Sequence, residues 1–428
     1  MKVACGSPQC QTTPQNCANI SHCTFSRSAL LYRLLASLDN FLLTERAKDK
    51  SRQQARQNQY KAQGSGIGFG SGSRIETTPA DQYNTFLSQN QSQARDFQLC
   101  NYFRGLRLIL TKSGDEIGLL GLMRTSLLGQ VMEELLRNDS ISDCSERAEL
   151  YTTFLASLQA IATNSQLAGF YTSEREGIER TDGLARIISG QGQLVKTKKG
   201  NNTGPWSFFL GPTTPTIDTS SPALLDLIQT LGKQADTFYN TASRVSGGLM
   251  INTADHNAIN SVNICKSIRT TRKVLQNTAN TALSSGTVAL PPSKPRNSTE
   301  SYHLACKKLA YDEFPAYATD TTFKFQNRAM GPIQVNPRRT ITLAKELSTM
   351  ATSLPPGIFL RNMPNRPDCI KALIIGVEGT PYHGGIWEFD IWATGEYPVD
   401  PPLVHLNTTS NQRVRFNPNL YAYIPKLK

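Results

Sequence analysis

Two apolar runs on either side of a turn sequence limit most strongly how this chain can fold. The first run, DCIKALIIGV, occupies residues 368–377, and the second, IWEFDIWA, occupies residues 386–393 and alternates apolar with polar residues. Between them, EGTPYHGG supplies the glycines and the proline of a turn. Such runs joined by turn residues predict a β-hairpin. After a further turn, GEYPVDPP, the segment LVHL at residues 403–406 predicts another short strand.

A helix is predicted directly before these strands. The segment TITLAKELSTMATSL, residues 340–354, ends at a Pro-Pro pair, because proline cannot continue a helix. A strand is expected to follow the prolines. One helix followed by an antiparallel meander gives an α+β fold class. The apolar face of the helix is formed by Leu343, Leu347, Met350 and Leu354.

Helical patterns fill much of the chain before this block. In one of them, ELYTTFLASLQAIA, apolar residues recur every three or four positions and form a single face. Because such faces must be buried on one another, an irregular α-helical region is expected, and no strict repeat supports a regular solenoid. The patterns span residues 97–111, 116–136, 145–162, 222–242 and 256–283, and the face of the third consists of Leu150, Phe154, Leu158 and Ile161.

Composition divides the chain into five parts. A polar stretch containing GSGIGFGSGS has no strand before it, so a disordered linker is expected rather than a phosphate-binding loop. The aromatic segment NNTGPWSFFLG, residues 201–211, is interpreted as a packing plug or a peptide-binding edge. The parts are an N-terminal segment with one helix (1–43), the Gly- and Gln-rich linker (44–96), the helical region (97–283), a proline-containing linker (284–300) and the sheet-forming block (301–428).

The net charge of +12 results from 45 basic and 33 acidic residues. The densest basic runs are residues 46–56, 196–199 and 266–273. Such an excess attracts phosphate backbones, yet these runs contain no interleaved aromatic residues on which bases could stack. We interpret them as solvated helix faces and linkers, and nucleic acid is not expected as a partner.

The nine cysteines are an odd number and most lie far apart, which argues against a disulfide framework. Those near the N-terminus are separated by four, six and five residues, wider than the usual spacing of zinc ligands, so no metal or other cofactor is expected. No apolar stretch reaches the ~18 residues that span a bilayer, and MKVACGSPQC lacks the apolar region of a signal peptide. The sequence predicts an intracellular protein, cytoplasmic or nuclear, without membrane contact.

The last block resembles the core of ubiquitin-conjugating (E2) enzymes. That family has a Gly-x-x-x-Thr-Pro-Tyr-x-x-Gly hairpin followed by Tyr-Pro-x-x-Pro-Pro, and both patterns occur here in register. The likeness covers residues 338–421, and RVRFNPNLY is similar to the giant E2 branch of BRUCE (apollon) proteins. It implies a truncated UBC-like fold, with an N-terminal helix and an antiparallel β-meander. The matching residues are Gly376, Thr380, Pro381, Tyr382, Gly385, Phe389, Tyr397, Pro398, Pro401 and Pro402.

The resemblance also implies an active-site turn formed by Asn417, Pro418 and Asn419. An E2 enzyme holds ubiquitin as a thioester on a cysteine and passes it to a lysine amine, which needs a nucleophilic thiol and a donor for the developing oxyanion. Asn419 matches the family's oxyanion-supporting residue. The family's nucleophilic Cys would follow by eight residues, where Leu427 stands. This chain is therefore expected to lack thioester chemistry.

Two explanations of Leu427 stay open. The chain is either an incomplete product of a full enzyme, from a gene model or splice form, or an evolved inactive variant. We favour the first, because an inactive variant would be expected to keep the helices that cover the sheet. Without those helices, an apolar patch is expected. It would include Ile374, Trp387, Phe389 and Ile391, while Cys306 and Cys369 are expected to be buried structural residues.

The sequence thus predicts a fragment of a large E2 enzyme that is itself inactive. By resemblance, its partners are ubiquitin, the ubiquitin-activating enzyme and a ubiquitin ligase. A non-catalytic adaptor that binds ubiquitin or a ligase, with a UEV-like role, is the first alternative function. A basic helical module that binds nucleic acid is the second.

Overall fold

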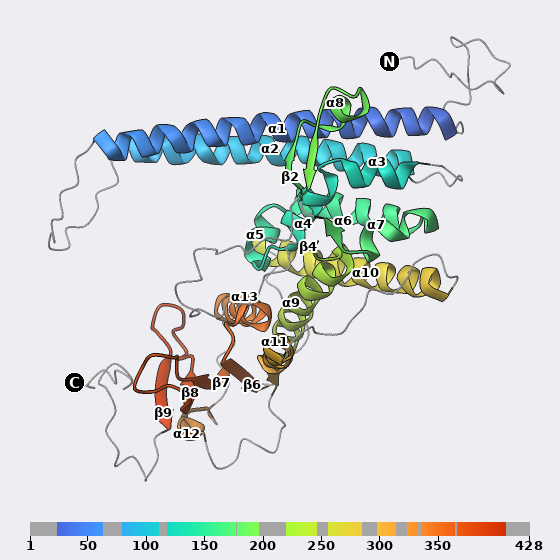
Figure 1. Ribbon diagram of the computed structural model, residues 1–428. Coiled ribbons are helices and arrows are strands. Elements are labelled where there is room, and N and C mark those ends of the chain that lie inside the picture. Colours follow the sequence, from blue (N-terminus) through green and yellow to red (C-terminus); the bar gives the residue numbers. More distant parts are fainter. Residues whose placement is uncertain are drawn as a thin grey trace.

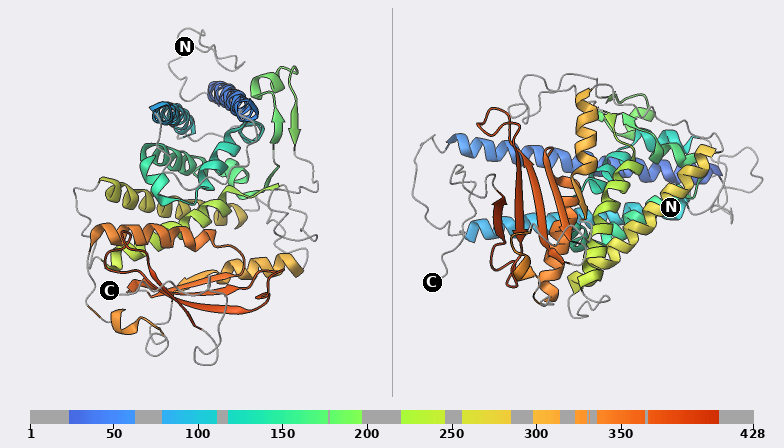
Figure 2. Two further views of the ribbon diagram at one scale, coloured as in Figure 1. Left: turned by 90° about the vertical axis from the view of Figure 1, so that its left-hand side faces the viewer. Right: turned by 90° about the horizontal axis from the view of Figure 1, so that it is seen from below.

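The structure is a computed structural model in which the helices gather in one region and a sheet lies beside them (Figure 1). The fold class is α+β, as predicted. Helix α13 lies between the sheet and the main group of helices (Figure 2). The structure describes residues 24–62, 79–110, 118–176, 178–196, 220–245, 256–284, 298–313, 323–329, 331, 336–363 and 366–407.

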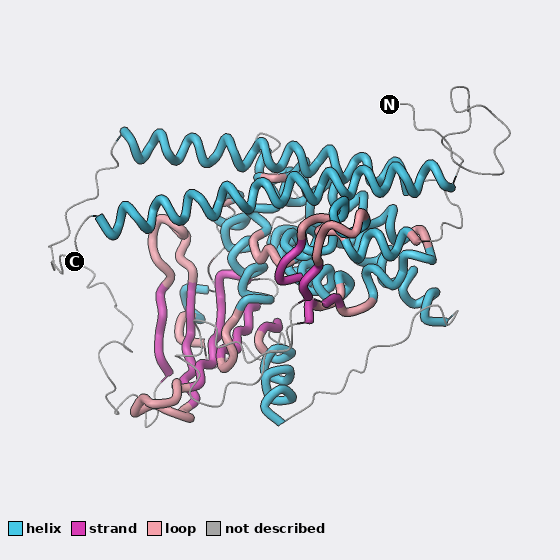
Figure 3. Tube along the Cα trace, turned by 45° about the horizontal axis from the view of Figure 1, so that its top comes forward, coloured by secondary structure: helices cyan, strands magenta, loops and turns pink. Residues whose placement is uncertain are grey.

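Two long helices, α1 (Thr24–Ala62) and α2 (Pro79–Leu110), run side by side along the outer edge of the helical region (Figures 1 and 3). Ser37 and Tyr102 join them through a hydroxyl–hydroxyl hydrogen bond of 3.0 Å. Both helices extend into residues 44–96, where the sequence analysis expects a disordered linker. The structure differs there because the Arg, Lys, Gln and Ala of this stretch have high helix propensity, which outweighs the shortage of apolar residues.

The other predicted helical patterns correspond to helices, with one division. The pattern at 116–136 forms two helices, because Ser126 leaves helical geometry with φ −79° and ψ 164°. None of the helices in the described part of the chain is both long and apolar enough to cross a membrane. The helices here are α3 (Leu119–Thr125), α4 (Leu128–Leu136), α5 (Ile141–Glu146), α6 (Ala148–Ala162), the 3₁₀ turn η1 (Ser165–Leu167), α7 (Ala168–Thr172), α8 (Leu184–Ile188), α9 (Leu224–Val245) and α10 (His256–Ser284).

Two small antiparallel strand pairs interrupt the helical region, and the sequence analysis does not predict them. The pair β1 (Arg175–Glu176) and β4 (Ser220–Ser221) is two residues long, and β2 (Ile178–Thr181) pairs with β3 (Leu194–Lys196). Strands this short hold too few alternating positions to give a recognisable pattern. The aromatic segment at 201–211 lies outside the described residues.

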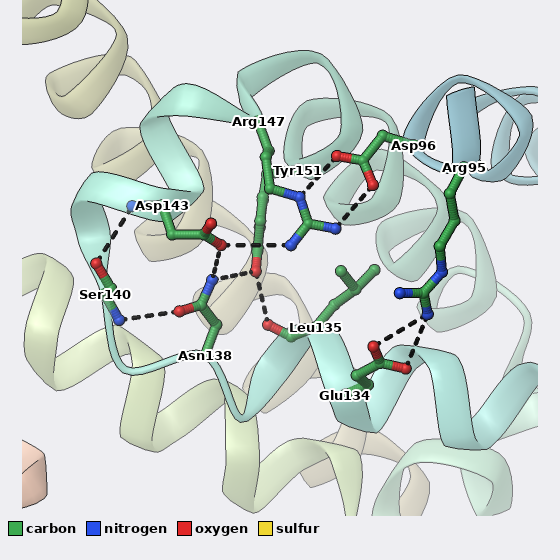
Figure 4. A network of polar contacts seen from close by, with 9 residues as sticks. All are labelled: Arg95, Asp96, Glu134, Leu135, Asn138, Ser140, Asp143, Arg147 and Tyr151. Atoms are coloured by element: carbon green, nitrogen blue, oxygen red, sulfur yellow. Dashed lines mark hydrogen bonds and ion pairs between the residues drawn. The ribbon is translucent and has the colours of Figure 1, made fainter. Parts of the chain in front are cut away.

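A polar network at one edge of the helical core connects α2, α5 and α6 (Figure 4). Arg147 donates from Nε and Nη2 to the carboxylate of Asp96 at 2.7 and 2.9 Å, and from Nη1 to Asp143 at 3.3 Å. Tyr151, fully buried, donates from its hydroxyl to the carbonyl oxygen of Leu135 at 3.1 Å. Because the buried polar groups have partners, the network holds these helices in one arrangement.

The sheet has five strands in the order β5-β6-β7-β8-β9, with β5 parallel to β6 and every other pair antiparallel. The predicted hairpin forms β7 and β8, and LVHL lies in β9. The strand expected after the Pro-Pro pair is β6, whereas β5 is unpredicted and only three residues long. The elements are α11 (Ser298–Leu309), β5 (Tyr311–Glu313), α12 (Gln326–Ala329), α13 (Pro337–Ser353), β6 (Ile358–Met363), β7 (Arg366–Ile375), β8 (Ile386–Trp392) and β9 (Leu403–Asn407).

Helix α13 takes part in two hydrophobic cores. Leu347 packs against Leu360 in the core between α13 and the sheet. Ala344, fully buried, belongs to the core of the helical region. On the same side, Gln234 of α9 donates from Nε2 to Thr352 Oγ1 at 2.5 Å. The helical region and the sheet are therefore connected mainly through one helix that is covered on both sides, with a smaller direct contact between α9 and β7.

Asp39 of α1 is fully buried and joins three helices. Its Oδ1 accepts a hydrogen bond from the backbone N–H of Leu127, before α4, at 2.8 Å, and its Oδ2 accepts from Leu184, at the start of α8, at 2.9 Å. Burial raises the pKa of Asp39 to about 6, although these two hydrogen bonds and the charge of Arg46 act in the opposite direction.

Asp39 should therefore make stability depend on pH. Its folded pKa lies above its ordinary value of 3.8, so its contribution favours folding most below pH ~4 and declines as pH rises through about 6. The decline amounts to about 3 kcal/mol at most, since one pKa unit corresponds to about 1.4 kcal/mol. Urea unfolding at several pH values should show this decline in the protein and not in Asp39→Asn. Parallel pH profiles of the two proteins would contradict it.

Candidate functional site

The turn between β7 and β8 needs glycine at position 376. A Cβ added at Gly376 would lie 1.8 Å from the carbonyl oxygen of Tyr382, closer than any real contact. The backbone N–H of Gly376 donates to Gly385 O at 2.8 Å, and Thr380 Oγ1 donates to Val377 O at 2.7 Å. The turn thus folds back on itself, and the predicted motif residues meet within it. Pro381 lies exposed at its tip.

The second predicted motif, in the turn between β8 and β9, contacts α13. Tyr397 donates a hydrogen bond from its hydroxyl to the carboxylate of Glu346 on α13. Burial, and then the neighbouring Glu346 carboxylate, raise the pKa of Tyr397. The Tyr397–Pro398 peptide bond is cis. Pro398, Pro401 and Pro402 are exposed. The aromatic residue of this motif therefore fastens the turn to the helix, while its prolines face solvent.

A buried ion-pair cluster, not predicted from the sequence, joins the start of α13, the first residues of β7 and the end of β8, where the β8–β9 turn begins. Arg339 donates to Asp368 Oδ2 at 3.1 Å and to the carbonyl oxygens of Ala393 and Thr394, each at 2.7 Å. Arg366 donates to both oxygens of Asp368 at 3.0 Å. Although burial alone would raise the pKa of Asp368, the hydrogen bonds and charges of the two arginines hold it below its ordinary value.

The start of α13 positions Arg339 for this cluster. Asn336 caps the helix, since its Oδ1 accepts from the backbone N–H of Arg338 at 3.0 Å and of Arg339 at 3.4 Å. Proline at the first helical position suits this geometry. The sequence NPRR directly before an apolar helical pattern is the only signal that could have indicated the cluster. It fixes a helix start but does not identify the carboxylate partner.

The residues predicted to form the active-site turn lie in a part of the chain that the structure does not describe. Asn417, Pro418, Asn419 and Leu427 follow residue 407, and thus lie outside the described residues. Their assignment as an active-site turn therefore stays a prediction. Strands β8 and β9 pair side by side on either side of the second turn motif. In the sequence, β9 is followed by the segment that contains residues 417–419.

The cysteines in the described part of the chain are all buried and unpaired. Burial raises the pKa of Cys369 to about 12, and the adjacent Asp368 acts in the same direction. Cys369 packs with Phe323 on the sheet face that α13 does not cover. A thiol that is neutral near pH 7 and sealed from solvent is a poor nucleophile. The group consists of Cys100, Cys144, Cys265, Cys306 and Cys369.

Apolar surface is left at the turn end of the sheet. Leu373 is 40% exposed and Ile386 is 69% exposed, both on the face turned away from α13. The residues that the sequence analysis expects to form an apolar patch lie on the α13 face and are half-buried. They are Ile374, Trp387, Phe389 and Ile391. Within the described residues, no group of His, Cys, Asp and Glu is arranged to hold a metal ion.

These elements, a helix followed by a meander with both turn motifs, correspond to a known family model. The model described as "Ubiquitin-conjugating enzyme" matches residues 342–423, which include most of α13 and strands β6 to β9. The C-terminal part of this chain belongs to the ubiquitin-conjugating enzyme (UBC core) family, and its α13 and sheet form a UBC-like fold.

Several curated proteins resemble the chain over longer or shorter ranges. The human "Dual E2 ubiquitin-conjugating enzyme/E3 ubiquitin-protein ligase BIRC6" is 28% identical over 325 residues, which cover 71% of this chain and 6% of that protein. The "Probable ubiquitin-conjugating enzyme protein 17" of Caenorhabditis elegans is 27% identical over 313 residues, covering 70% and 38%. The "Putative ubiquitin-conjugating enzyme E2 39" of Arabidopsis thaliana is 44% identical over 79 residues, covering 18% and 24%.

The chain spans only a small share of these relatives, from 6% of the human protein to 38% of the nematode protein. Even so, a similarity that covers 71% of this chain extends well beyond residues 342–423. It therefore includes part of the helical region. The sequence similarity to those two larger relatives is therefore not confined to the UBC-like part.

Substituting Gly376 by alanine should disrupt the β7–β8 turn. The added methyl group would overlap the Tyr382 carbonyl oxygen, which belongs to the backbone and cannot move without opening the turn. We expect a loss of at least about 2 kcal/mol in the free energy of unfolding. Urea unfolding measures it, followed by the fluorescence of Trp387 and Trp392 in β8 in a Trp206→Phe background.

Gly121→Ala in α3 is a matched control, because a Cβ at Gly121 meets nothing within 4 Å. It should leave stability unchanged or raise it by about 0.5 to 1 kcal/mol, as alanine favours helix. Equal destabilisation by the two substitutions would contradict the steric explanation.

Substituting Ala344 by leucine should destabilise the helical region and the sheet together. The larger side chain must enter the tightly packed space on the helical side of α13, at a cost of about 1 to 3 kcal/mol. Far-ultraviolet circular dichroism reports mainly the helices, and tryptophan fluorescence reports β8 when Trp206 is replaced by phenylalanine in every variant. Both unfolding midpoints should fall equally, whereas Ser353→Leu, at the exposed end of α13, should change neither. A shift in one signal alone would contradict the coupling.

Proposed function

We propose that this chain acts in ubiquitin conjugation, with its UBC-like part as the functional module and ubiquitin, a ubiquitin-activating enzyme and a ubiquitin ligase as partners. The observation that carries this proposal is the family match at residues 342–423, which falls on a helix followed by a meander. In this fold the first turn motif is closed by hydrogen bonds within itself, and the second is fastened to α13 through Tyr397. The printed names of the relatives, which describe conjugating enzymes and in one case also a ligase, support it. We also propose a cytoplasmic or nuclear location.

The finer proposal is that this chain does not carry ubiquitin as a thioester itself. Residue 427, eight residues after Asn419, is leucine, which has no nucleophilic atom. The described thiols offer no substitute, because burial raises the pKa of Cys144 and of Cys369 to about 12 and removes the thiols from solvent. Asn419 would then retain a place in the turn without a reaction to support.

A thioester assay tests this proposal. The 428-residue chain is incubated with ubiquitin, ubiquitin-activating enzyme and ATP, and the products are separated with and without a reducing agent. We expect no adduct that disappears on reduction. Cys369→Ser is the matched variant: if an adduct forms on the natural chain and is lost in this variant, Cys369 is the carrier and the proposal is overturned. An adduct that persists in the variant also overturns it.

A second candidate function is that of a non-catalytic adaptor, which binds ubiquitin or a ligase without chemistry. The exposed apolar side chains of the UBC-like part favour it, since Ile386, Val377 and Val399 are 69%, 66% and 86% exposed. Titration of isotope-labelled ubiquitin with the full chain distinguishes the two. Ubiquitin signals that shift while no thioester forms support the adaptor, and unchanged signals at high concentration of the chain exclude ubiquitin as its ligand.

A further inference from the structure

Helix α10 presents an outward face without acidic residues. Between His256 and Ser284 the helix contains two lysines, two arginines and no aspartate or glutamate. Its buried face packs into the helical core through residues such as Ile268 and Leu275. The exposed residues recur every three or four positions, which places them along one stripe. The stripe consists of Asn263, Lys266, Thr270, Lys273, Asn277, Asn280 and Ser284, and Asn257 and Thr281 are exposed as well.

Two arginines on the flank of this stripe share one carboxylate of α9. Arg269 Nε lies 2.8 Å from Asp236 Oδ1, and Arg272 Nη1 lies 2.7 Å from Asp236 Oδ2. The guanidinium of Arg269 also lies over the ring of Tyr239, 4.6 Å from its centroid. Arg272 passes so close to Gly232 that a Cβ there would lie 2.5 Å from its Cδ. Both arginines are thus held in fixed positions, with one negative charge for two positive ones.

The basic run of α1 is arranged differently. Lys48 pairs with Glu45 at 2.9 Å, and Arg52 pairs with Asp49 at 3.5 Å, each within one turn of the same helix. Acidic residues therefore accompany the basic ones in α1. In α10, Lys266 and Lys273 have no acidic residue on their own helix that could pair with them. Positive potential should be stronger along α10 than along the longer basic run of the sequence.

We propose that the outward stripe of α10, together with the flanking Arg269 and Arg272, binds an acidic protein segment. Aspartates or glutamates spaced three and four residues apart on a helical partner would lie opposite Lys266 and Lys273, which are seven residues apart. Arg269 and Arg272 already bind the carboxylate of Asp236 between them, so the spacing of their guanidinium groups suits a carboxylate.

A protein partner fits this surface better than nucleic acid does. The exposed stripe contains no aromatic side chain on which a base could stack. The ring of Tyr239, next to the stripe, is covered by the Arg269 guanidinium. Figures 1 and 2 show that the C-terminal half of α10 projects away from the sheet, so such a partner could bind while the UBC-like part stays accessible. This inference is independent of the proposed role in ubiquitin conjugation.

Fluorescence anisotropy with the full-length chain tests the proposal, and the probe is a labelled, helix-forming peptide rich in glutamate. The double substitution Lys266→Glu and Lys273→Glu should weaken binding roughly fivefold or more, and added salt should weaken binding to the natural chain. Lys48→Glu with Lys50→Glu on α1 is the matched control, since these lysines are also exposed and the charge change is identical. The control should bind within about twofold of the natural chain.

The other outcomes overturn the proposal. Equal weakening by the two double variants would mean that only net charge matters, and absence of peptide binding at low salt would remove the surface altogether. Single-stranded RNA and duplex DNA of the same net charge are run in parallel. If either binds more tightly than the peptide and is weakened by the α10 variant, the ligand is nucleic acid instead. Circular dichroism of each variant confirms that the helices are intact.

Discussion

The position of α13 between two hydrophobic cores is the constraint on which the rest of this structure depends. Its small residues Ala344 and Ser348 face the helical region and are fully buried, whereas Leu347 packs against the sheet. A helix with a large side chain at every core position could not approach α9 this closely, because the space is already filled to normal packing density. The sheet therefore obtains its orientation from a helix whose own position is determined by the helical region.

Polar contacts then fix the meander on this helix. Arg339 bridges the start of α13 to the first residues of β7 and to the end of β8, while Tyr397 joins the following turn to Glu346 in the middle of the helix. The two contacts hold both ends of the short segment 393–397, which connects β8 to the following turn. Strands β8 and β9 therefore cannot slide along α13 without breaking one of these contacts. Removing one partner of a buried ion pair commonly costs several kcal/mol.

The hairpin, the strand at 403–406 and the apolar face of α13 could be predicted, because period, turn residues and proline stops are local properties of the sequence. Gly376 was identified only as a residue of the turn motif, and its close approach to the Tyr382 carbonyl was not predicted. The extent of α1 and α2, the short strands β1 to β5 and the pairing of Arg339 with Asp368 could not be predicted. The helices extend through a stretch whose helix propensity outweighs its shortage of apolar residues, and the strands are too short to show an alternating pattern. The pairing of Arg339 with Asp368 joins residues far apart in the chain, which no local pattern encodes. The residues 417–419 lie beyond the described part, so their role rests on resemblance.

The two-sided burial of α13 affects where this protein can be divided. The match to the family model begins at residue 342, inside α13 and after both the Asn336 cap and Arg339. A recombinant piece starting there would expose Ala344 and Ser348 to water and leave Asp368 without one of its two arginines. Sequence similarity and physical autonomy thus have different borders here, and a self-sufficient unit must include α9 as well as the sheet.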